Sequence, residues 1–184
     1  GYRKLDGVEA VDRLRWSDFI RNHPETSFFQ TPEFYDYLLL IPNYEPILIG
    51  VAGQDNVLVG LLLGFIISEY KTFLGSFSSR LIVHGGPLIM SDHPEIPAVL
   101  DYILKSFIEK VKKRSLIIQI RNHHNVSEFK TIFEKNGFFY KDHLNLTINT
   151  QTGATEDFPI SKSKLRQVRK SLEAGAVITT AESL

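Results

Sequence analysis

The residues best suited to chemistry in the first half of this sequence lie around a double glycine. His84 precedes Gly85-Gly86-Pro87, and a side chain beside two glycines can sit where a ligand closely approaches the backbone. The same Gly-Gly-Pro is also ordinary turn chemistry. Arg80, four residues earlier, can bind a carboxylate or phosphate through two hydrogen bonds, or can be a solvated charge at a strand edge. Arg80, His84, Gly85 and Gly86 are therefore candidate substrate contacts.

Two other stretches carry polar side chains that need an explanation. Gln30 and Tyr35 flank Thr31, and they either contact a substrate or belong to the cap of the helix that follows. The stretch from Pro159 to Gly175 predicts a basic amphipathic helix that ends at its glycine. Its basic side chains either bind RNA phosphates or form a solvated face. They are Lys162, Lys164, Arg166, Arg169 and Lys170, with Glu173 as the opposing charge.

Several reaction classes lose support because their motifs are absent. The sequence has no GxxxxGK[ST], GxGxxG, HExxH or GxSxG. It has no cysteine, which excludes disulfides, thiolate metal sites and a cysteine nucleophile. His123 and His124 are neighbours whose side chains point apart on a strand or in a tight loop, so they do not favour a tetrahedral metal site. We expect no metal and no cofactor.

Length and charge bound the class of protein. The 184 residues are 43% hydrophobic, enough for one sizeable core. Lys and Arg together number 21, as do Asp and Glu, so any affinity for nucleic acid or a membrane surface must be local. The longest apolar run, residues 57–67, is shorter than the ~20 residues that cross a bilayer. We expect no transmembrane segment and a cytoplasmic location.

Hydrophobic periodicity predicts an α+β fold in which helices cover a mixed sheet. Residues 46–51 and 57–67 predict an antiparallel hairpin joined by a turn at Gly53-Gln54-Asp55-Asn56. The later order of strand, helix and strand completes the mixed sheet. The patterns predict helices at 16–20, 31–41, 97–111 and 127–136, further strands at 80–83, 116–120 and 140–148, and the start of another strand at 177–180.

Four segments resemble one known family. WSDFIRNHPETSFFQTPEFYDY, residues 16–37, resembles the opening of the Fem-type (FemAB-like) peptidoglycan bridge aminoacyl transferases, which are lipid II:glycine glycyltransferase-like and belong to the GNAT superfamily. SSRLIVHGGPLI at 78–89 and NGFFYKDHLNLTINT at 136–150 resemble later parts of the first domain of that family. KLRQVRKSLEAGAVI at 164–178 resembles the junction into its second domain.

The resemblance implies a GNAT-like (acyl-CoA N-acyltransferase-like) fold with a mixed, largely antiparallel sheet. Residues 1–157 would form the first GNAT-like domain, and 158–184 the linking helix and first strand of a second domain that is otherwise missing. The family forms an amide on a cell-wall precursor peptide, with aminoacyl-tRNA as donor. Gln30, Tyr35, Arg80 and His84 would then contact the acceptor, and Arg166, Arg169 and Lys170 the donor or the domain interface. We expect this chain to be inactive alone.

Three functions stay open at this point: an aminoacyl or N-acyl transferase, a non-catalytic binding module with a GNAT-like fold, and an acyl-CoA-dependent N-acetyltransferase. The [QR]xxGx[GA] motif that cradles the pyrophosphate of acetyl-CoA is not matched in spacing by residues 80–85, RLIVHG. The sequence therefore disfavours acetyl-CoA. It identifies no side chain as the catalytic base.

Overall fold

The structure, a computed structural model, describes residues 1–68, 79–145, 161–177 and 179. The chain falls into two units, Gly1–His143 and Leu144–Leu184, and each is described by itself.

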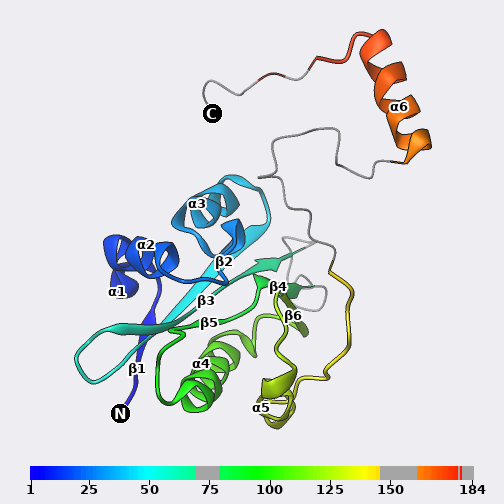
Figure 1. The fold of residues 1–184 in the computed structure, drawn as a ribbon. Helices are drawn as coiled ribbons and strands as arrows, with labels where there is room; N and C mark the ends of the chain where they lie inside the picture. Colours follow the sequence, from blue (N-terminus) through cyan, green and yellow to red (C-terminus); the bar gives the residue numbers. More distant parts are fainter. Residues whose placement is uncertain (69–78, 146–160, 178, 180–184) are drawn as a thin grey trace. The chain divides into compact units, whose positions relative to one another are not determined.

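The first unit is built on a mixed, largely antiparallel sheet (Figure 1). Its strands follow the order β1 (Arg3–Asp6), β2 (Tyr44–Ala52), β3 (Leu58–Ile67), β4 (Arg80–Gly85) and β6 (Ile117–Asn122), and β5 (Leu88–Ile89) also pairs with β3. All described pairings are antiparallel except the one between β4 and β6. This architecture confirms the predicted α+β class with a mixed, largely antiparallel sheet flanked by helices.

The hairpin of β2 and β3 forms as its sequence predicts. Gly53 N–H donates to Val57 O at 2.9 Å, and Asn56 adopts a φ of 59°, the left-handed geometry that tight turns require. Nearly every residue of β3 is buried because both faces of the sheet are covered. That burial explains why the apolar run at 57–67 shows no alternation.

Helices cover the two faces of the sheet separately (Figure 1). One face packs against α1 (Val8–Val11), α2 (Arg13–Arg21), the 3-10 turn η1 (Phe28–Gln30) and α3 (Pro32–Leu40). The other packs against α4 (Ile96–Val111), the 3-10 turn η3 (Ser127–Phe129) and α5 (Lys130–Lys135). Thr31 caps α3 by accepting a hydrogen bond from Phe34 N–H, as expected from the sequence.

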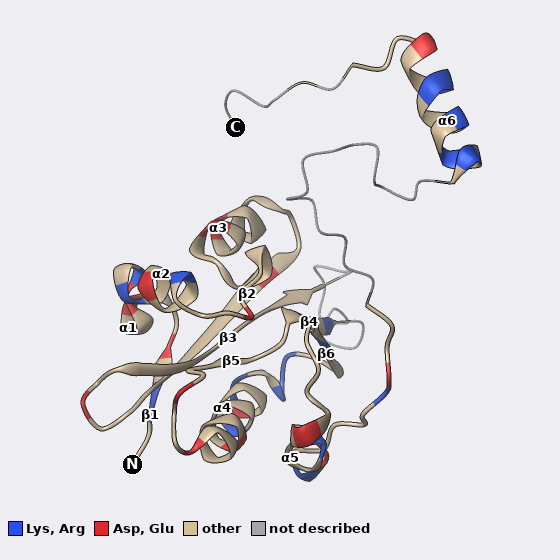
Figure 2. Cartoon of the chain, viewed as in Figure 1, with Lys and Arg blue, Asp and Glu red and all other residues tan. Residues whose placement is uncertain are grey.

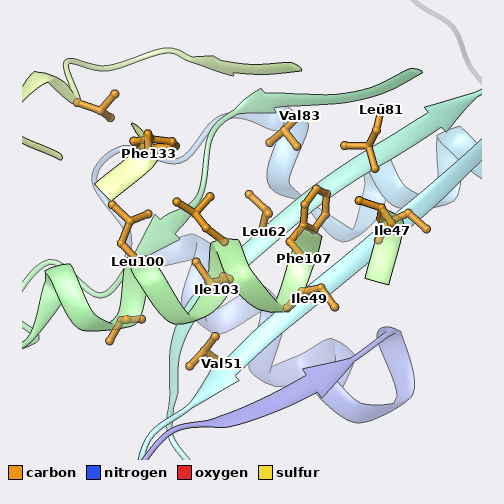
Figure 3. Packing of buried hydrophobic residues seen from close by; sticks show 14 of the residues in the cluster. Ile47, Ile49, Val51, Leu62, Leu81, Val83, Leu100, Ile103, Phe107 and Phe133 are labelled. Atoms are coloured by element: carbon orange, nitrogen blue, oxygen red, sulfur yellow. The ribbon is translucent and has the colours of Figure 1, made fainter. Parts of the chain in front are cut away.

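Two glycines of β3 let α4 lie close to the sheet. A Cβ at Gly60 would lie 3.0 Å from Val99 Cγ1, and one at Gly64 would lie 2.9 Å from Phe107 Cζ. Phe107 and Ile103 are fully buried between α4 and the strands (Figure 3). The glycines therefore supply space that the larger side chains of the helix fill.

The observed strands differ from the predicted ones in two places. β1 was not predicted, because Arg3-Lys4-Leu5-Asp6 offers one apolar residue and hence no visible alternation, although Leu5 is buried. The strand expected at 140–148 is wrong over 140–145, which have no regular secondary structure. Leu144, which the pattern predicted to face inward, is 79% exposed. No described strand pairs with residues 140–145. Residues 146–148 lie outside the described part.

The second unit contains α6 (Lys162–Glu173), the predicted basic helix (Figure 2). Ser161 caps it by accepting from Lys164 N–H, and Gly175 follows with a φ of +89° in the left-handed region, as expected. Of the predicted strand at 177–180, Ile178 and Thr180 lie outside the described residues. In the part of the chain that is described, no helix combines the length and apolar character needed to cross a bilayer.

The packing of α4 gives a stability prediction. Leu104→Ala removes a fully buried side chain and should lower the free energy of unfolding by about 2–5 kcal/mol. The same change at Leu39 in α3, which is 60% exposed, should cost less than about 1 kcal/mol. Urea unfolding followed by the fluorescence of Trp16, the one tryptophan of the sequence, measures both. Equal losses for the two variants would contradict this account of the core.

Candidate functional site

The parallel strands β4 and β6 diverge at their carboxyl ends, after Gly85 and Asn122, and we call this place the fork. These parallel strands pair in register up to Gly85 and Asn122. Beyond that point the chain from β4 continues into β5, which pairs with β3 through Leu88 and Ile89, while the chain after Asn122 leaves the sheet as a loop. Ligands of sheets with parallel strands bind outside the carboxyl ends of those strands. The side chains around the fork therefore form a candidate site.

The double glycine makes the bend that opens the fork. Gly85 and Gly86 have φ values of +84° and +78°, which residues with a Cβ rarely adopt. A Cβ on Gly85 would overlap the side-chain amide of Gln30, and one on Gly86 would overlap Asn122 Oδ1. Both glycines are thus required by conformation and by close approach. The stretch bends the backbone at these two glycines, and the bend lies at the fork.

Gln30 holds this bend from the side of η1. Its side chain is fully buried, and its Oε1 accepts hydrogen bonds from Ser27 N at 2.9 Å and from Ser27 Oγ at 2.6 Å. Its Nε2 donates to Gly86 O at 3.4 Å, and its backbone carbonyl accepts from Trp16 Nε1 at 2.8 Å. Gln30 therefore lies beside the double glycine, and its side chain positions the bend.

His84 presents an imidazole in an aromatic setting next to the bend. Its ring centroid lies 4.9 Å from that of Phe29, 5.9 Å from Phe65 and 6.5 Å from His123. The side chain is half-buried and makes no hydrogen bond with the described residues. Burial lowers the pKa of His84, and the nearby charge of Arg121 lowers it further. His84 is therefore uncharged near neutral pH and able to accept a proton.

A second group of histidines lies beside β5. His23 Nδ1 accepts from Glu25 N–H at 3.2 Å, so its Nε2 carries the proton and donates to Ile89 O at 2.7 Å. His124 Nε2 lies 3.2 Å from Glu25 Oε2. Burial lowers the pKa of His124, although Glu25 acts in the opposite direction. Among the described residues, no three acidic, histidine or cysteine side chains form a group that could hold a metal.

The other predicted residues lie elsewhere. Tyr35 packs edge-on against Trp16 at 5.9 Å, and burial raises its pKa. Arg80 is exposed at the first position of β4, about 13 Å along the strand from His84 at ~3.3 Å per residue. Arg166, Arg169 and Lys170 are exposed on α6 in the second unit. The structure thus groups Gln30, His84, Gly85 and Gly86 and leaves Arg80 at the other end of β4.

Sequence reasoning missed the residues that approach the fork from the start of the chain. Phe29 and the pair of His23 and Glu25 reach it across about 55 to 100 residues of sequence. Pairing across such distances leaves no local pattern. His123 and His124 were noticed as neighbours, and the structure directs them to different partners, His84 and Glu25, as their adjacency predicts.

The fold has counterparts among solved structures of acetyltransferases. An aminoglycoside 6'-N-acetyltransferase from Acinetobacter haemolyticus is 13% identical with a TM-score of 0.53, over 80% of this chain and 97% of that one. A ribosomal-protein-alanine N-acetyltransferase from Brucella melitensis biovar Abortus 2308 is 12% identical with a TM-score of 0.51, over 81% and 99%. A transcriptional regulator from Bacillus halodurans C-125 is 16% identical with a TM-score of 0.53, over 81% and 99%.

These similarities define the class of fold: the first unit has the GNAT fold. No protein-family model and no curated protein matches the sequence.

The start of α4 does not fit the pyrophosphate of a CoA thioester. Such a group needs free N–H donors at a helix N-terminus. Here Glu95 N–H donates to His93 Nδ1, Pro97 has no N–H, and Ala98 N–H donates to Glu95 O. The segment between β5 and α4 contains Asp92 and Glu95 but no Lys or Arg. Its carboxylates would repel a pyrophosphate.

The bend at the fork generates a prediction with an internal control. Gly85 and Gly137 share a φ of +84°, but a Cβ at Gly137 has nothing within 4 Å. Gly137→Ala should therefore cost about 1–2 kcal/mol from the backbone alone. Gly85→Ala should cost about 1–3 kcal/mol more, because it also displaces Gln30. Urea unfolding measures both, and equal costs would show that Gln30 does not constrain the bend.

The lowered pKa of His84 predicts a specific pH dependence. The unfolded chain binds a proton at this residue near its ordinary pKa of ~6.5, whereas the folded protein binds it only at lower pH. The unfolded state thus holds more protons between these two pKa values, and stability falls as pH decreases through that window. His84→Gln should lose less stability between pH 7 and 5 than the wild type. Parallel urea midpoints for the two proteins across that range would contradict the assignment.

Proposed function

We propose that this protein is an aminoacyl or N-acyl transferase that forms an amide bond on an amine acceptor, with the fork as the place of reaction. One observation carries the proposal: an uncharged imidazole, His84, stands at the carboxyl ends of the parallel strands of a GNAT fold. Its ring is held by aromatic neighbours and makes no hydrogen bond with the described residues. A nitrogen of this ring is therefore available to a substrate.

The reaction assigns a defined role to that nitrogen. The neutral amine of the acceptor attacks the carbonyl carbon of an aminoacyl ester, the new C–N bond forms and the C–O bond of the ester breaks. His84 takes the proton that the amine loses and returns it to the oxygen of the leaving group, which departs as a hydroxyl. A pKa below the ordinary histidine value keeps His84 ready to accept this proton at neutral pH.

For the donor we propose aminoacyl-tRNA, which is consistent with two features. The carboxylates at the start of α4 disfavour the pyrophosphate of CoA. The exposed cations of α6 suit a phosphate backbone, and they include Arg166, Arg169 and Lys170 (Figure 2). The alternative role for these residues is contact with a second domain. For the acceptor we propose a peptidoglycan precursor peptide. That part of the proposal depends on the Fem-type resemblance of residues 16–37, 78–89, 136–150 and 164–178.

We also propose that residues 1–157 act as the first GNAT-like domain of a larger transferase. Residues 158–184 then connect it, through α6, to a second GNAT-like domain. The apolar side chains of α6 support this connection: Leu165, Val168 and Leu172 lie on one side of the helix and are 42–55% exposed. Transfer would accordingly require both domains, and a cytoplasmic location would suit a tRNA donor.

An acyl-CoA-dependent N-acetyltransferase is the second candidate. The names of two solved structures with this fold favour it, because both describe N-acetyltransferases. Coenzyme A separates the candidates, since a ligand that binds the folded protein raises its melting temperature. Saturating CoA should leave the melting temperature unchanged if the donor is aminoacyl-tRNA. A clear rise would favour the second candidate.

Binding of tRNA tests the proposed donor. Replacing Arg166 and Arg169 with Gln should weaken tRNA binding and reduce the slope of log K against log salt concentration by about 1.5, because each lost phosphate contact removes ~0.7–0.9. The paired change of Lys112 and Lys113 to Gln, after α4, serves as a control of equal charge and should leave the slope unchanged. An unchanged slope in the α6 variant would show that these arginines do not contact phosphates.

A further inference from the structure

A pocket with a volume of about 520 Å³ lies on the α2 side of the first unit. Its walls come from α2, from the beginning of β3 and from the segment that follows β5. This volume falls within the ~300–1,000 Å³ of typical small-molecule sites. Neither the resemblance nor the proposed acyl transfer assigns a ligand to it.

The inner surface of the pocket is largely apolar. Phe19, Leu58 and Met90 line it, and His23 closes one side with its ring centroid 5.6 Å from that of Phe19. The orientation of His23 is fixed by its hydrogen bonds to Ile89 O and Glu25 N. These apolar side chains can pack against aliphatic groups of a ligand. Charged groups of the same ligand would need charged residues of the pocket as partners.

Two opposite charges on different walls remain available to a ligand. Arg15 comes from α2 and Asp92 from the segment after β5, and both line the pocket. Neither side chain makes an ion pair or hydrogen bond with the described residues. Asp18, which also lines the pocket, is already paired with Arg21 at 3.2 Å. Among the described residues that line it, the pocket therefore offers one unpaired cation and one unpaired anion beside an apolar surface.

We propose that this pocket binds a short peptide in its zwitterionic form. The terminal carboxylate pairs with the guanidinium of Arg15, and the terminal ammonium pairs with the carboxylate of Asp92. Aliphatic side chains of the peptide pack on Phe19, Leu58 and Met90. An amine alone would leave Arg15 unpaired, and a carboxylic acid alone would leave Asp92 unpaired. This inference holds whether or not the fork transfers acyl groups.

Three matched peptides test the assignment by isothermal titration calorimetry on the full chain. Leu-Leu carries both charges, N-acetyl-Leu-Leu lacks the cation, and Leu-Leu amide lacks the anion. Leu-Leu should bind most tightly, and either blocking group should weaken binding by about 10-fold, the order expected for one charge-assisted hydrogen bond. Equal affinities for the three peptides, or no binding of Leu-Leu, would overturn the proposal.

Two variants then locate each end of the peptide. Arg15→Gln should weaken Leu-Leu and N-acetyl-Leu-Leu by about 10-fold and leave Leu-Leu amide unchanged. Asp92→Asn should weaken Leu-Leu and Leu-Leu amide and leave N-acetyl-Leu-Leu unchanged. Lys113→Gln and Asp55→Asn make the same charge changes at exposed positions outside the pocket and should affect none of the peptides.

The crossed pattern cannot arise from unfolding, because a variant that lost its fold would bind all three peptides less well. A uniform loss across the peptides in variants with wild-type melting temperatures would show that Arg15 and Asp92 do not pair with the two ends of the peptide, and would overturn the proposal. Failure here is distinguishable from failure of the acyl-transfer proposal, which concerns tRNA binding by α6 and the proton chemistry of His84.

Discussion

The candidate site depends on a bend in the backbone that only glycine readily makes. Gly85 and Gly86 take left-handed conformations, and the space beside them is filled by the amide of Gln30 and by Asn122. The bend ends the register between β4 and β6 and turns the chain toward β5. His84 immediately precedes it, so the same constraint that opens the fork also fixes where the imidazole stands.

The cost of this bend is offset by buried hydrogen bonds from a distant part of the chain. Gln30 bonds both to Ser27 and to Gly86 O, and Trp16 bonds to the carbonyl of Gln30. Buried polar groups of this kind stabilise a structure only when their partners are present, since an unpaired one costs about 1–3 kcal/mol. The short turn η1 is therefore part of the site even though none of its polar atoms needs to touch a substrate.

Much of the fold was predictable because it follows from local patterns. The stripe of α4, the cap at Thr31, the turn after Gly53 and the stop at Gly175 each leave a signal within a few residues. β1 was not predicted and the strand expected at 140–145 was wrong, because whether a strand forms depends on the edge available to pair with it.

The site was predictable only in part, for a similar reason. His84 and the double glycine are marked by sequence, and Gln30 was identified beside a helix start. The approach of Phe29 to His84 and of Glu25 to His124 arises from tertiary packing and has no local pattern. Arg80 shares a strand with His84, and the rise of an extended chain separates the two side chains.

The fork and the peptide pocket share a structural element, the short strand β5. Ile89 O accepts the hydrogen bond of His23, and Met90, the next residue, lines the pocket. His23 also lines the pocket, while its partner Glu25 contacts His124 next to the fork. A peptide that moves His23 must therefore alter either its bond to β5 or its bond to Glu25. The bond to Glu25 leads to His124, whose Nε2 lies 3.2 Å from the carboxylate of the same residue, so a change in the position of His23 alters the electrostatics at His124.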